Sequence, residues 1–324
     1  MQKQSWFMLE NKNIVFDKKL LPLVSVVIPT YNRPKLVGNA IESVLAQTFQ
    51  NFEIIVVDDS TDNETEMVVK NFNNAKIKYI RVEDIQKGSA AARKKNIGVR
   101  NSSPDSKYIA FLDDDDEWLP RYLEVVIEEL EKDKSLTGVI PQGISKLRDG
   151  TILKRRILKP SEFRFWKHGV GNCWTLRKEI FIKENIWYDE NDIFEDLDFV
   201  LKLKDHKLKI IPQILWISYP LPQTKGASSS TKFERQADNI PYFFQKHFET
   251  YKKAGKEALS FLYYFTGKIY CQAGRIKEGR KHLREAFKIY PTLEHFLYYT
   301  ASLFFPQIFQ SYKLQFWKHK LLGK

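Results

Sequence analysis

The first 132 residues alternate short strand-like runs with helical patterns, and this alternation constrains the fold more than any other feature. Runs rich in Val, Ile, Phe and Tyr predict β-strands at 24–29, 52–57, 77–82 and 108–112. Segments with apolar residues at helical spacing, or with an Ala-rich composition, predict helices at 33–48, 64–71, 88–99 and 119–132. Strand–helix–strand units of this kind build a parallel sheet with helices on both faces. We therefore predict an α/β fold.

After residue 137 the pattern becomes less regular. It predicts short strands at 139–141 and 151–153 around a turn at Asp149-Gly150, a helix at 195–206 and a late strand at 210–218. Residues 224–231 are rich in Gly, Ser and Thr, which is typical of a linker, and the chain beyond them is almost entirely helical in pattern. We expect a lead-in over 1–22, an α/β domain over 23–225 and a helical extension over 226–324.

Polar residues follow three of the predicted strands at the point where each strand ends. They are Thr30-Tyr31-Asn32, Asp58-Asp59 and the run Asp113 to Asp116. In open α/β sheets, ligands bind just beyond the carboxyl ends of the strands. These residues are therefore the first place to look for a functional site.

The run of four aspartates is the sharpest of these features. Four adjacent carboxylates repel one another, so we expect something to compensate their charge, and hard divalent cations prefer oxygen ligands. Mg²⁺ typically binds through one or two carboxylates together with substrate phosphates. The alternative is a solvated acidic turn that caps the helix after Pro120. The location at the end of an apolar strand favours the metal site.

Other polar residues are less specific on their own. Asp58 and Asp59 could accept hydrogen bonds from a ribose hydroxyl or a base N–H, or could cap the next helix. Glu195 and Asp196 open a predicted helix, where a carboxylate could act as a general base or merely as a cap. Arg93 and its neighbour Lys94 could face phosphates or be solvated.

Taken together, these segments resemble the family 2 glycosyltransferases, which have the GT-A fold. The resemblance covers about residues 23–220. It is carried, in matching order and spacing, by Val24 to Arg33, Ser43 to Thr48, Glu53 to Ser60, Tyr108 to Asp116 and Phe194 to Asp198.

The resemblance implies a role for each residue on the donor side. Thr30 and Tyr31 would line the nucleotide base, with Tyr31 stacking on it. Asp59 would hydrogen-bond the base and Asp58 would support the pocket. Arg93 would belong to the same pocket, although the family often has Ala-Arg-Asn where this chain has Ala-Ala-Arg-Lys-Lys-Asn.

For catalysis, the resemblance implies that Asp115 is the main metal ligand, assisted by Asp113, and that Asp114 reaches the ribose or the metal. Asp196 would be the catalytic base, with Glu195 beside it. The implied reaction is an inverting, hexosyltransferase-type displacement at the anomeric carbon of a nucleoside-diphosphate sugar. The cofactor would be Mn²⁺ or Mg²⁺, and a UDP-sugar is the commonest donor. A glycan or glycolipid acceptor would place the reaction in the synthesis of a cell-surface polysaccharide, lipopolysaccharide or other glycan.

The acceptor side is less specific. The segment 169–175 lies where such enzymes often place acceptor loops, and Trp174 could stack on a sugar or belong to the core. His168 could be a site residue or a solvated loop residue.

The C-terminal part differs in charge from the rest of the chain. The formal net charge is +12, and residues 226–324 hold 17 Lys and Arg against 7 Asp and Glu. One helix is predicted on each side of Ala273-Gly274-Arg275, and this pair of helices resembles half of a tetratricopeptide repeat. The aromatic and basic segment 296–320 suits either a helix at an anionic membrane interface or packing against the α/β domain.

Two further expectations concern location and alternative functions. The chain has two cysteines, Cys173 and Cys271, and no apolar run typical of a signal peptide or a membrane span, which favours the cytoplasm, with possible peripheral contact at the inner face of the membrane. A nucleotidyltransferase usually needs a Gly-rich phosphate loop that the first strand lacks. A basic scaffold or nucleic-acid-binding protein would leave the aspartates unexplained, and we expect no specific nucleic-acid partner.

Overall fold

The computed structural model describes residues 23–83, 89–147, 151–153, 158–168, 173–219 and 229–310. Its strands are β1 Leu23–Thr30, β2 Phe52–Asp58, β3 Ile77–Arg81, β4 Ser106–Phe111, β5 Asp116–Trp118, β6 Gly138–Lys146, β7 Ile152–Leu153, β8 Thr175–Arg177 and β9 Leu208–Ser218. Its α-helices are α1 Pro34–Leu45, α2 Glu64–Asn71, α3 Ala90–Arg100, α4 Tyr122–Lys132, α5 Glu179–Ile182, α6 Glu195–Lys202, α7 Ser229–Lys253, α8 Lys256–Gln272, α9 Ile276–Ile289 and α10 Leu293–Phe304.

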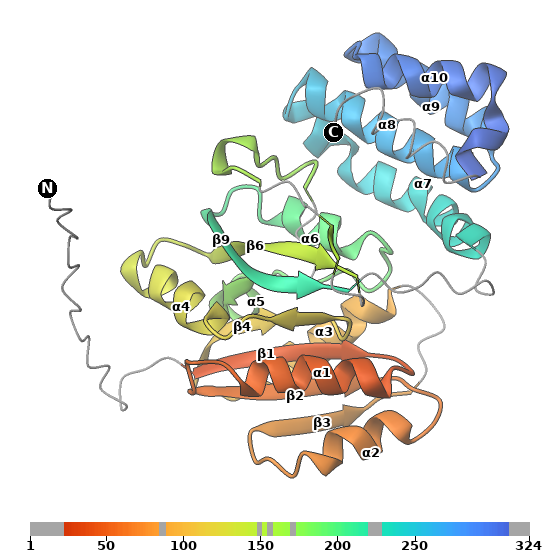
Figure 1. The fold of residues 1–324 in the computed structure, drawn as a ribbon. Helices are drawn as coiled ribbons and strands as arrows, with labels where there is room; N and C mark the ends of the chain where they lie inside the picture. Colours follow the sequence, from red (N-terminus) through yellow and green to blue (C-terminus); the bar gives the residue numbers. More distant parts are fainter. Residues whose placement is uncertain are drawn as a thin grey trace, which may run out of the picture.

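All the described strands belong to one sheet, in the order β3-β2-β1-β4-β8-β6-β9-β5, with β7 paired to β6 (Figure 1). The first four strands in this order are parallel, as predicted. Strand β8 is antiparallel to both β4 and β6, and β5 is antiparallel to β9. The α/β prediction, with a mostly parallel sheet, is confirmed.

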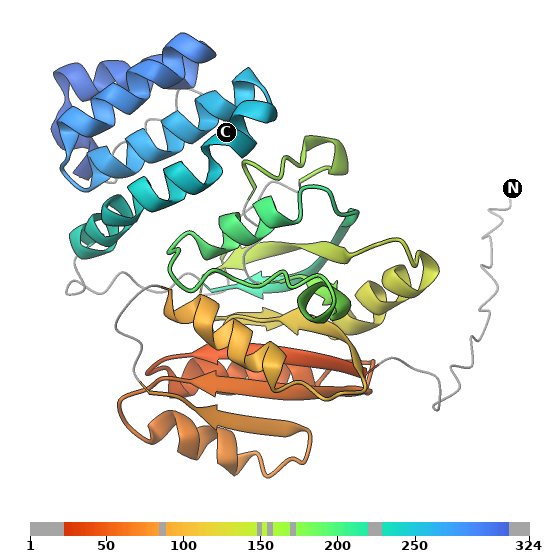
Figure 2. The ribbon, with the colours of Figure 1, turned by 180° about the vertical axis from the view of Figure 1, so that it is seen from behind.

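Helices cover both faces of the sheet, because the side chains of each strand alternate between two apolar layers. On β1, Val24, Val26 and Ile28 pack with α1, α2 and α4, whereas Val27 packs with α3, α5 and α6. Figure 1 shows the first set of helices in front of the sheet, and Figure 2 shows the second set from behind.

Several predicted boundaries need correction. Residues 116–118, before the predicted helix at 119–132, form β5, and helix α4 begins only at Tyr122. The strand predicted at 139–141 extends to Lys146, because its long pairing with β9 continues past Pro141. The helix predicted at 195–206 ends at Lys202. Strand β8 and helix α5 were not predicted, because segments of three and four residues are too short to show periodicity.

Among the described residues, the α-helices α7 to α10 form the C-terminal part, which lies on the side of the sheet that carries α6 (Figure 1). The predicted turn at residues 273–275 separates α8 from α9, with Gly274 at φ 80°. The supposed linker is partly helix, since α7 begins at Ser229, and its residues 224–228 lie outside the described part. Helices α7 and α8 pack on the α/β part through an apolar cluster that includes Trp166, Phe194 and Phe243. None of the described helices is long and apolar enough to span a membrane.

The aromatic segment at the C-terminus divides between two environments. Helix α10 packs against α8 and α9, and Phe309 is buried among these helices rather than against the sheet. Phe296, Phe304 and Phe305 are exposed. The lead-in 1–22, the turn at Asp149-Gly150 and the aromatic and basic residues after 310 lie outside the described residues.

Candidate active site

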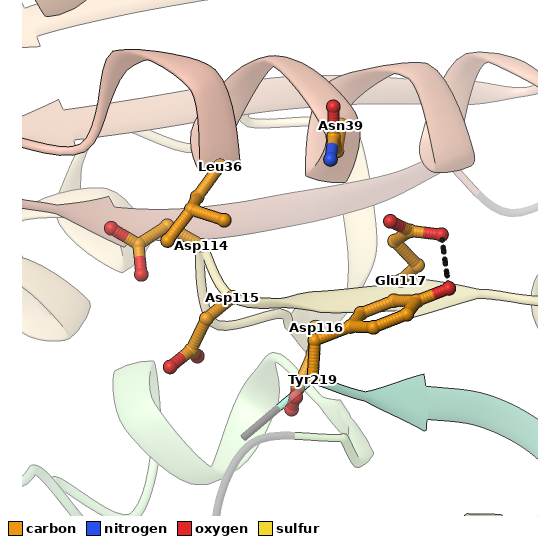
Figure 3. A pocket seen from close by; sticks show the side chains of 7 residues that line it. All are labelled: Leu36, Asn39, Asp114, Asp115, Asp116, Glu117 and Tyr219. Carbon is orange, nitrogen blue, oxygen red and sulfur yellow. Dashed lines mark hydrogen bonds between the residues drawn. The ribbon is translucent and has the colours of Figure 1, made fainter. Parts of the chain in front are cut away.

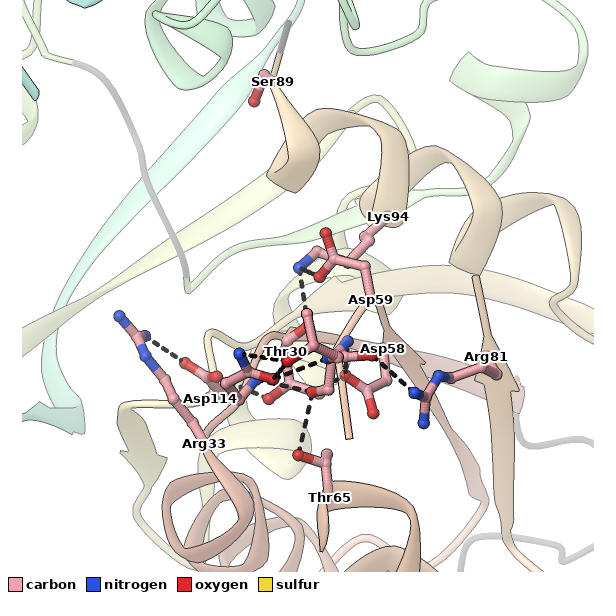
Figure 4. A network of polar contacts seen from close by, with 12 residues as sticks. Thr30, Arg33, Asp58, Asp59, Thr65, Arg81, Ser89, Lys94 and Asp114 are labelled. Carbon is pink, nitrogen blue, oxygen red and sulfur yellow. Dashed lines mark hydrogen bonds and ion pairs between the residues drawn. The ribbon is translucent and has the colours of Figure 1, made fainter. Parts of the chain in front are cut away.

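The carboxyl ends of β1, β2 and β4 bring Thr30, Asp58, Asp59 and Asp114 to one edge of the sheet (Figure 4). Thr30 is paired with Asp58 at the last position of the β1–β2 ladder, and Val27 with Phe111 on the other side of β1. The aspartate run follows β4 directly. Residues that are far apart in sequence therefore lie side by side, as their positions after parallel strands predicted.

Asp114 is held by the end of β1. Its carboxylate accepts a hydrogen bond from the Thr30 hydroxyl at 2.8 Å and pairs with Arg33 at 2.8 Å. Arg33 also lies 3.6 Å from Asp115. Burial raises the pKa of Asp114 even though the Arg33 guanidinium opposes this. The chain thus compensates part of the charge of the aspartate run itself, through an arginine that the sequence analysis did not single out.

The two aspartates after β2 have different contacts. Asp58 is fully buried, where it accepts hydrogen bonds from the Ser60 backbone N–H at 2.8 Å and from the Tyr79 hydroxyl at 2.7 Å. Asp59 forms an ion pair with the buried ammonium group of Lys94, which also donates to the Thr30 carbonyl at 2.7 Å. Asp58 therefore shapes the loop, and Asp59 lies at the junction of β1, β2 and α3.

Tyr31 and Asn32 complete this edge of the sheet. The Tyr31 ring is 43% exposed, and the Lys94 ammonium lies 5.8 Å from its centroid. Asn32 adopts a left-handed conformation, with φ 49°, and its side chain accepts a hydrogen bond from the Thr61 N–H at 2.9 Å. An exposed aromatic ring beside buried charges is a suitable platform for a nucleotide base.

Helix α3 presents two buried lysines to the site, whereas Arg93 is exposed. Lys94 contacts Asp59, as described above. Lys95 donates to Asp196 at 2.8 Å, and its side chain is only 2% exposed. The helix approaches β1 closely at Gly98, where an added Cβ would lie 2.3 Å from the Val27 side chain.

Lys95 lies between the aspartate run after β4 and the carboxylates at the start of α6. Burial alone would lower the pKa of Lys95, but Asp196, Asp113 and other nearby acidic groups raise it well above its ordinary value. Burial also raises the pKa of Asp113 well above the usual range, in spite of Lys95. Burial, and then the charge of Asp196, raise the pKa of Glu195 to about 7. Asp196 thus pairs directly with this buried ammonium group, and the charges of Asp113 and Glu195 act on it from nearby.

A cavity of about 220 Å³ opens beside the aspartate run (Figure 3). Asp114, Asp115 and Asp116 line it together with Leu36, Asn39, Glu117 and Tyr219. The Tyr219 hydroxyl donates to Glu117 at 3.2 Å. The cavity is small, but its wall is strongly acidic.

The carboxylates at this cavity fit a divalent cation. Asp115 lines the cavity and is accessible, with its side chain 27% exposed. Asp113 is not among the lining residues, but it lies two residues before Asp115, and burial raises its pKa, as do neighbouring negative charges. A hard cation would relieve this repulsion, and it prefers carboxylate oxygens.

On the acceptor side, Trp174 is a core residue. It is fully buried, donates from Nε1 to the Tyr188 hydroxyl at 3.3 Å and packs edge-on against Phe199. His168 is partly buried and accepts a hydrogen bond from the Arg164 N–H at 3.0 Å, and burial lowers its pKa. Residues 169–172 lie outside the described part.

We expect Trp174→Ala to destabilise the fold by about 3–5 kcal/mol, the range for truncating a large buried aromatic side chain. Chemical denaturation would measure this free energy of unfolding. Ile182→Ala is a suitable control, because Ile182 is 59% exposed. A loss below about 1 kcal/mol for Trp174→Ala would contradict its assignment to the core.

Comparison with known proteins gives a consistent result. Residues 25–184 match the family model described as Glycosyl transferase family 2. The putative colanic acid biosynthesis glycosyl transferase WcaA of Escherichia coli (strain K12) is 28% identical over 261 residues, which cover 75% of this chain and 88% of that protein. An uncharacterized glycosyltransferase of Methanocaldococcus jannaschii is 30% identical over 227 residues, which cover 66% of this chain and 76% of its own length.

A solved structure also shares the fold. The crystal structure of S. aureus TarS in complex with UDP-GlcNAc aligns with a TM-score of 0.56 and 16% sequence identity, over 86% of this chain and 79% of the TarS chain.

Proposed function

The chain belongs to glycosyl transferase family 2, and we propose that it transfers a sugar from a nucleoside-diphosphate sugar to a hydroxyl acceptor with inversion at the anomeric carbon. Membership of the family makes the chain a glycosyltransferase with the GT-A fold. The single observation that carries the finer proposal is the ion pair of Asp196 with the buried Lys95, at 2.8 Å, with Asp113 and Glu195 close enough for their charges to act on the same ammonium group.

The proposed donor pocket lies at the ends of β1, β2 and β4. Tyr31 would stack on the base and Asp59 would hydrogen-bond it, supported by Thr30 and Asp58. Asp114 would contact the ribose or the metal. Lys94 of α3 would complete the pocket. The neighbouring Arg93 is exposed, and its contact with the donor stays a prediction. A UDP-sugar is the first candidate donor, since the TarS structure holds UDP-GlcNAc.

We assign the role of catalytic base to Asp196 and the binding of the metal to Asp115 and Asp113. Asp196 would remove the proton from the acceptor hydroxyl, whose oxygen attacks the anomeric carbon opposite the leaving diphosphate. Mn²⁺ or Mg²⁺ held by Asp115 and Asp113 would neutralise charge on that diphosphate. Holding both substrates in line contributes as much as the base does. We propose residues 23–225 as the catalytic domain.

The experiment that tests this function is a donor panel. Purified protein with Mn²⁺ or Mg²⁺ is incubated with common UDP- and GDP-sugars, and release of the nucleoside diphosphate is followed together with thermal stability. We expect one donor to give metal-dependent release or stabilisation. Asp115→Ala should abolish the response, whereas Asp205→Asn, at a side chain that is 81% exposed, should not. Metal-independent release would contradict the assignment of Asp115.

The acceptor is proposed to be a growing glycan or glycolipid in cell-surface polysaccharide synthesis. The name of the WcaA relative, which refers to colanic acid biosynthesis, supports this proposal. Cytoplasmic reaction on a lipid-linked acceptor would require contact with an anionic membrane. Helix α9 carries exposed cations at Lys277, Lys281, Arg284 and Lys288. Exposed aromatic side chains follow on and after α10, with Phe304 at 68% and Phe305 at 53%. Such a surface suits a membrane interface.

We expect the chain to float with liposomes that contain anionic lipid at low salt. The bound fraction should fall as salt screens the cations, and it should fall further in a Phe304→Ala, Phe305→Ala double variant. Neutral phosphatidylcholine liposomes are the control. Absence of flotation at low salt would show that the extension does not bind anionic membranes.

A further inference from the structure

Helix α7 contacts the segment 189–198, which includes the first turn of α6. Near the middle of α7, the Asn239 side chain forms two hydrogen bonds with the backbone of this segment. It accepts from the Ile193 N–H at 3.2 Å and donates to the Asn191 carbonyl at 3.0 Å. One neutral side chain of the extension thus fixes the path of the chain just before Glu195.

Farther along α7, charged and polar side chains hold two aspartates of the same segment. Asp189 accepts from the Tyr242 hydroxyl at 2.6 Å and from the Lys246 ammonium at 2.5 Å. Lys246 also lies 2.5 Å from Asp198, and His247 contacts Asp198 through Nε2 at 2.9 Å. Asp198 is fully buried, so its own contacts are screened less by solvent and salt than those of Asp189.

The contacting residues of α7 recur at helical spacing. Positions 239, 242, 246 and 247 lie on one face of the helix. Apolar residues of the same region extend the contact, because Leu197 and Leu201 of α6 pack in one cluster with Ile240 and Phe243 of α7. The whole segment therefore lies against the extension.

Helix α6 needs this support because it is short. It has 8 residues, and isolated helices below about 12–15 residues are marginal in water. Side chains two residues apart on an α-helix point in directions that differ by about 200°. Asp198 accordingly faces α7 while Asp196 faces Lys95 of α3, so the helix is held from two sides.

The cluster Asp192, Asp198 and His247 also has the composition of a metal site, with ligand atoms within 4.8 Å of one another. However, the Lys246 ammonium lies among these groups, 3.7 Å from Asp192 and 2.5 Å from Asp198. A cation of the chain itself already supplies the positive charge, which favours an ion-pair network.

We propose that α7 is a positioning element of the transfer reaction: Asn239, Tyr242, Lys246 and His247 fix the segment 189–198 so that Glu195 and Asp196 stand at the edge of the sheet where the donor binds. This inference rests on the base role proposed for Asp196. It makes α7 a support of the active site that acts through the segment 189–198.

The test compares Asn239→Ala and Lys246→Met with Lys246→Arg and the control Gln245→Ala, which changes an exposed neighbour on α7. Turnover is measured as release of UDP from UDP-glucose and UDP-N-acetylglucosamine and of GDP from GDP-mannose. Nucleotide affinity is measured by calorimetry with UDP and GDP. We expect Asn239→Ala and Lys246→Met to lower kcat by about 10–100-fold, the loss that an ångström of misplacement causes. KM and nucleotide affinity should change less than about twofold.

Lys246→Arg should restore most of the turnover, and Gln245→Ala should leave it unchanged. If Lys246→Met folds poorly, Asn239→Ala still tests the inference, because it removes no charge. An unchanged kcat in both variants would overturn the inference, as would a parallel loss of kcat and nucleotide affinity. Asp196→Asn, measured alongside, separates the two hypotheses: its near-normal turnover would remove the base role itself, whereas an inactive Asp196→Asn with fully active α7 variants would remove only the role of α7.

Discussion

Replacing Asp196 by Asn is expected to lower sugar transfer by about 10²–10⁴-fold, the usual contribution of a general base. The amide keeps the size of the side chain but does not take the proton of the acceptor hydroxyl. Nucleotide binding should stay nearly intact, because the ends of β1 and β2 build the proposed base pocket without contributions from α6. Steady-state kinetics and calorimetry with the nucleoside diphosphate would measure the two quantities separately.

The control for this variant is Asp205→Asn, which removes a carboxylate from the surface just beyond the same helix. It should retain full turnover and affinity. Near-normal turnover in Asp196→Asn would exclude this residue as the base, and Glu195 would then be the next candidate. Loss of nucleotide affinity together with turnover would instead indicate that Asp196 supports the donor site.

The acidic half of the site could be predicted from the sequence because it follows from strand ends. Asp58 and Asp59 end an apolar run, as do Asp113 to Asp116, and a parallel sheet places such residues at one edge. This placement can be predicted without knowing how the side chains pack. The same reasoning does not predict which aspartate is buried and paired within the chain, and which is accessible, since this depends on Arg33 reaching Asp114 and Asp115 from the start of α1.

The basic half could not be assigned in the same way. Arg93, Lys94 and Lys95 are consecutive on a helix, and composition alone does not show which of them faces the sheet. Gly98 contained a usable signal, because a glycine inside a helix often marks close approach to another element. Lys94 and Lys95 lie four and three residues before it, on the same face of the helix, and Arg93 does not.

The role of α7 was beyond prediction for a different reason. Its polar residues are typical of any solvated helix, and only the tertiary fold shows that Asn239 and Lys246 meet a segment about 50 residues earlier in the chain. The tail composition indicated helices and positive charge, but the partner surface of each helix depends on long-range packing.

Replacement of Lys95 by Met is expected to affect both stability and transfer, because this lysine forms an ion pair with Asp196 and its charge also acts on Asp113 and Glu195. Removing one partner of a buried ion pair typically costs about 3–5 kcal/mol, since the other charge is left uncompensated. Asp196 is 30% exposed at its side chain, so water would partly solvate it. We therefore expect a loss of about 3 kcal/mol, at the lower end of that range, measured by chemical denaturation.

A double-mutant cycle tells this electrostatic effect apart from the loss of packing. If the damage comes from an unpaired carboxylate, Asp196→Asn in the Lys95→Met background should recover part of the lost stability, because residues in direct contact are coupled rather than additive. If Lys95 matters only for its methylene groups, the two losses should add, and that outcome would refute its role as counter-ion.

Lys95→Arg keeps the charge but places a larger planar group against Tyr188. It should retain more stability than Lys95→Met yet lose turnover, because the distance to Asp196, and hence the position of the proposed base, would change.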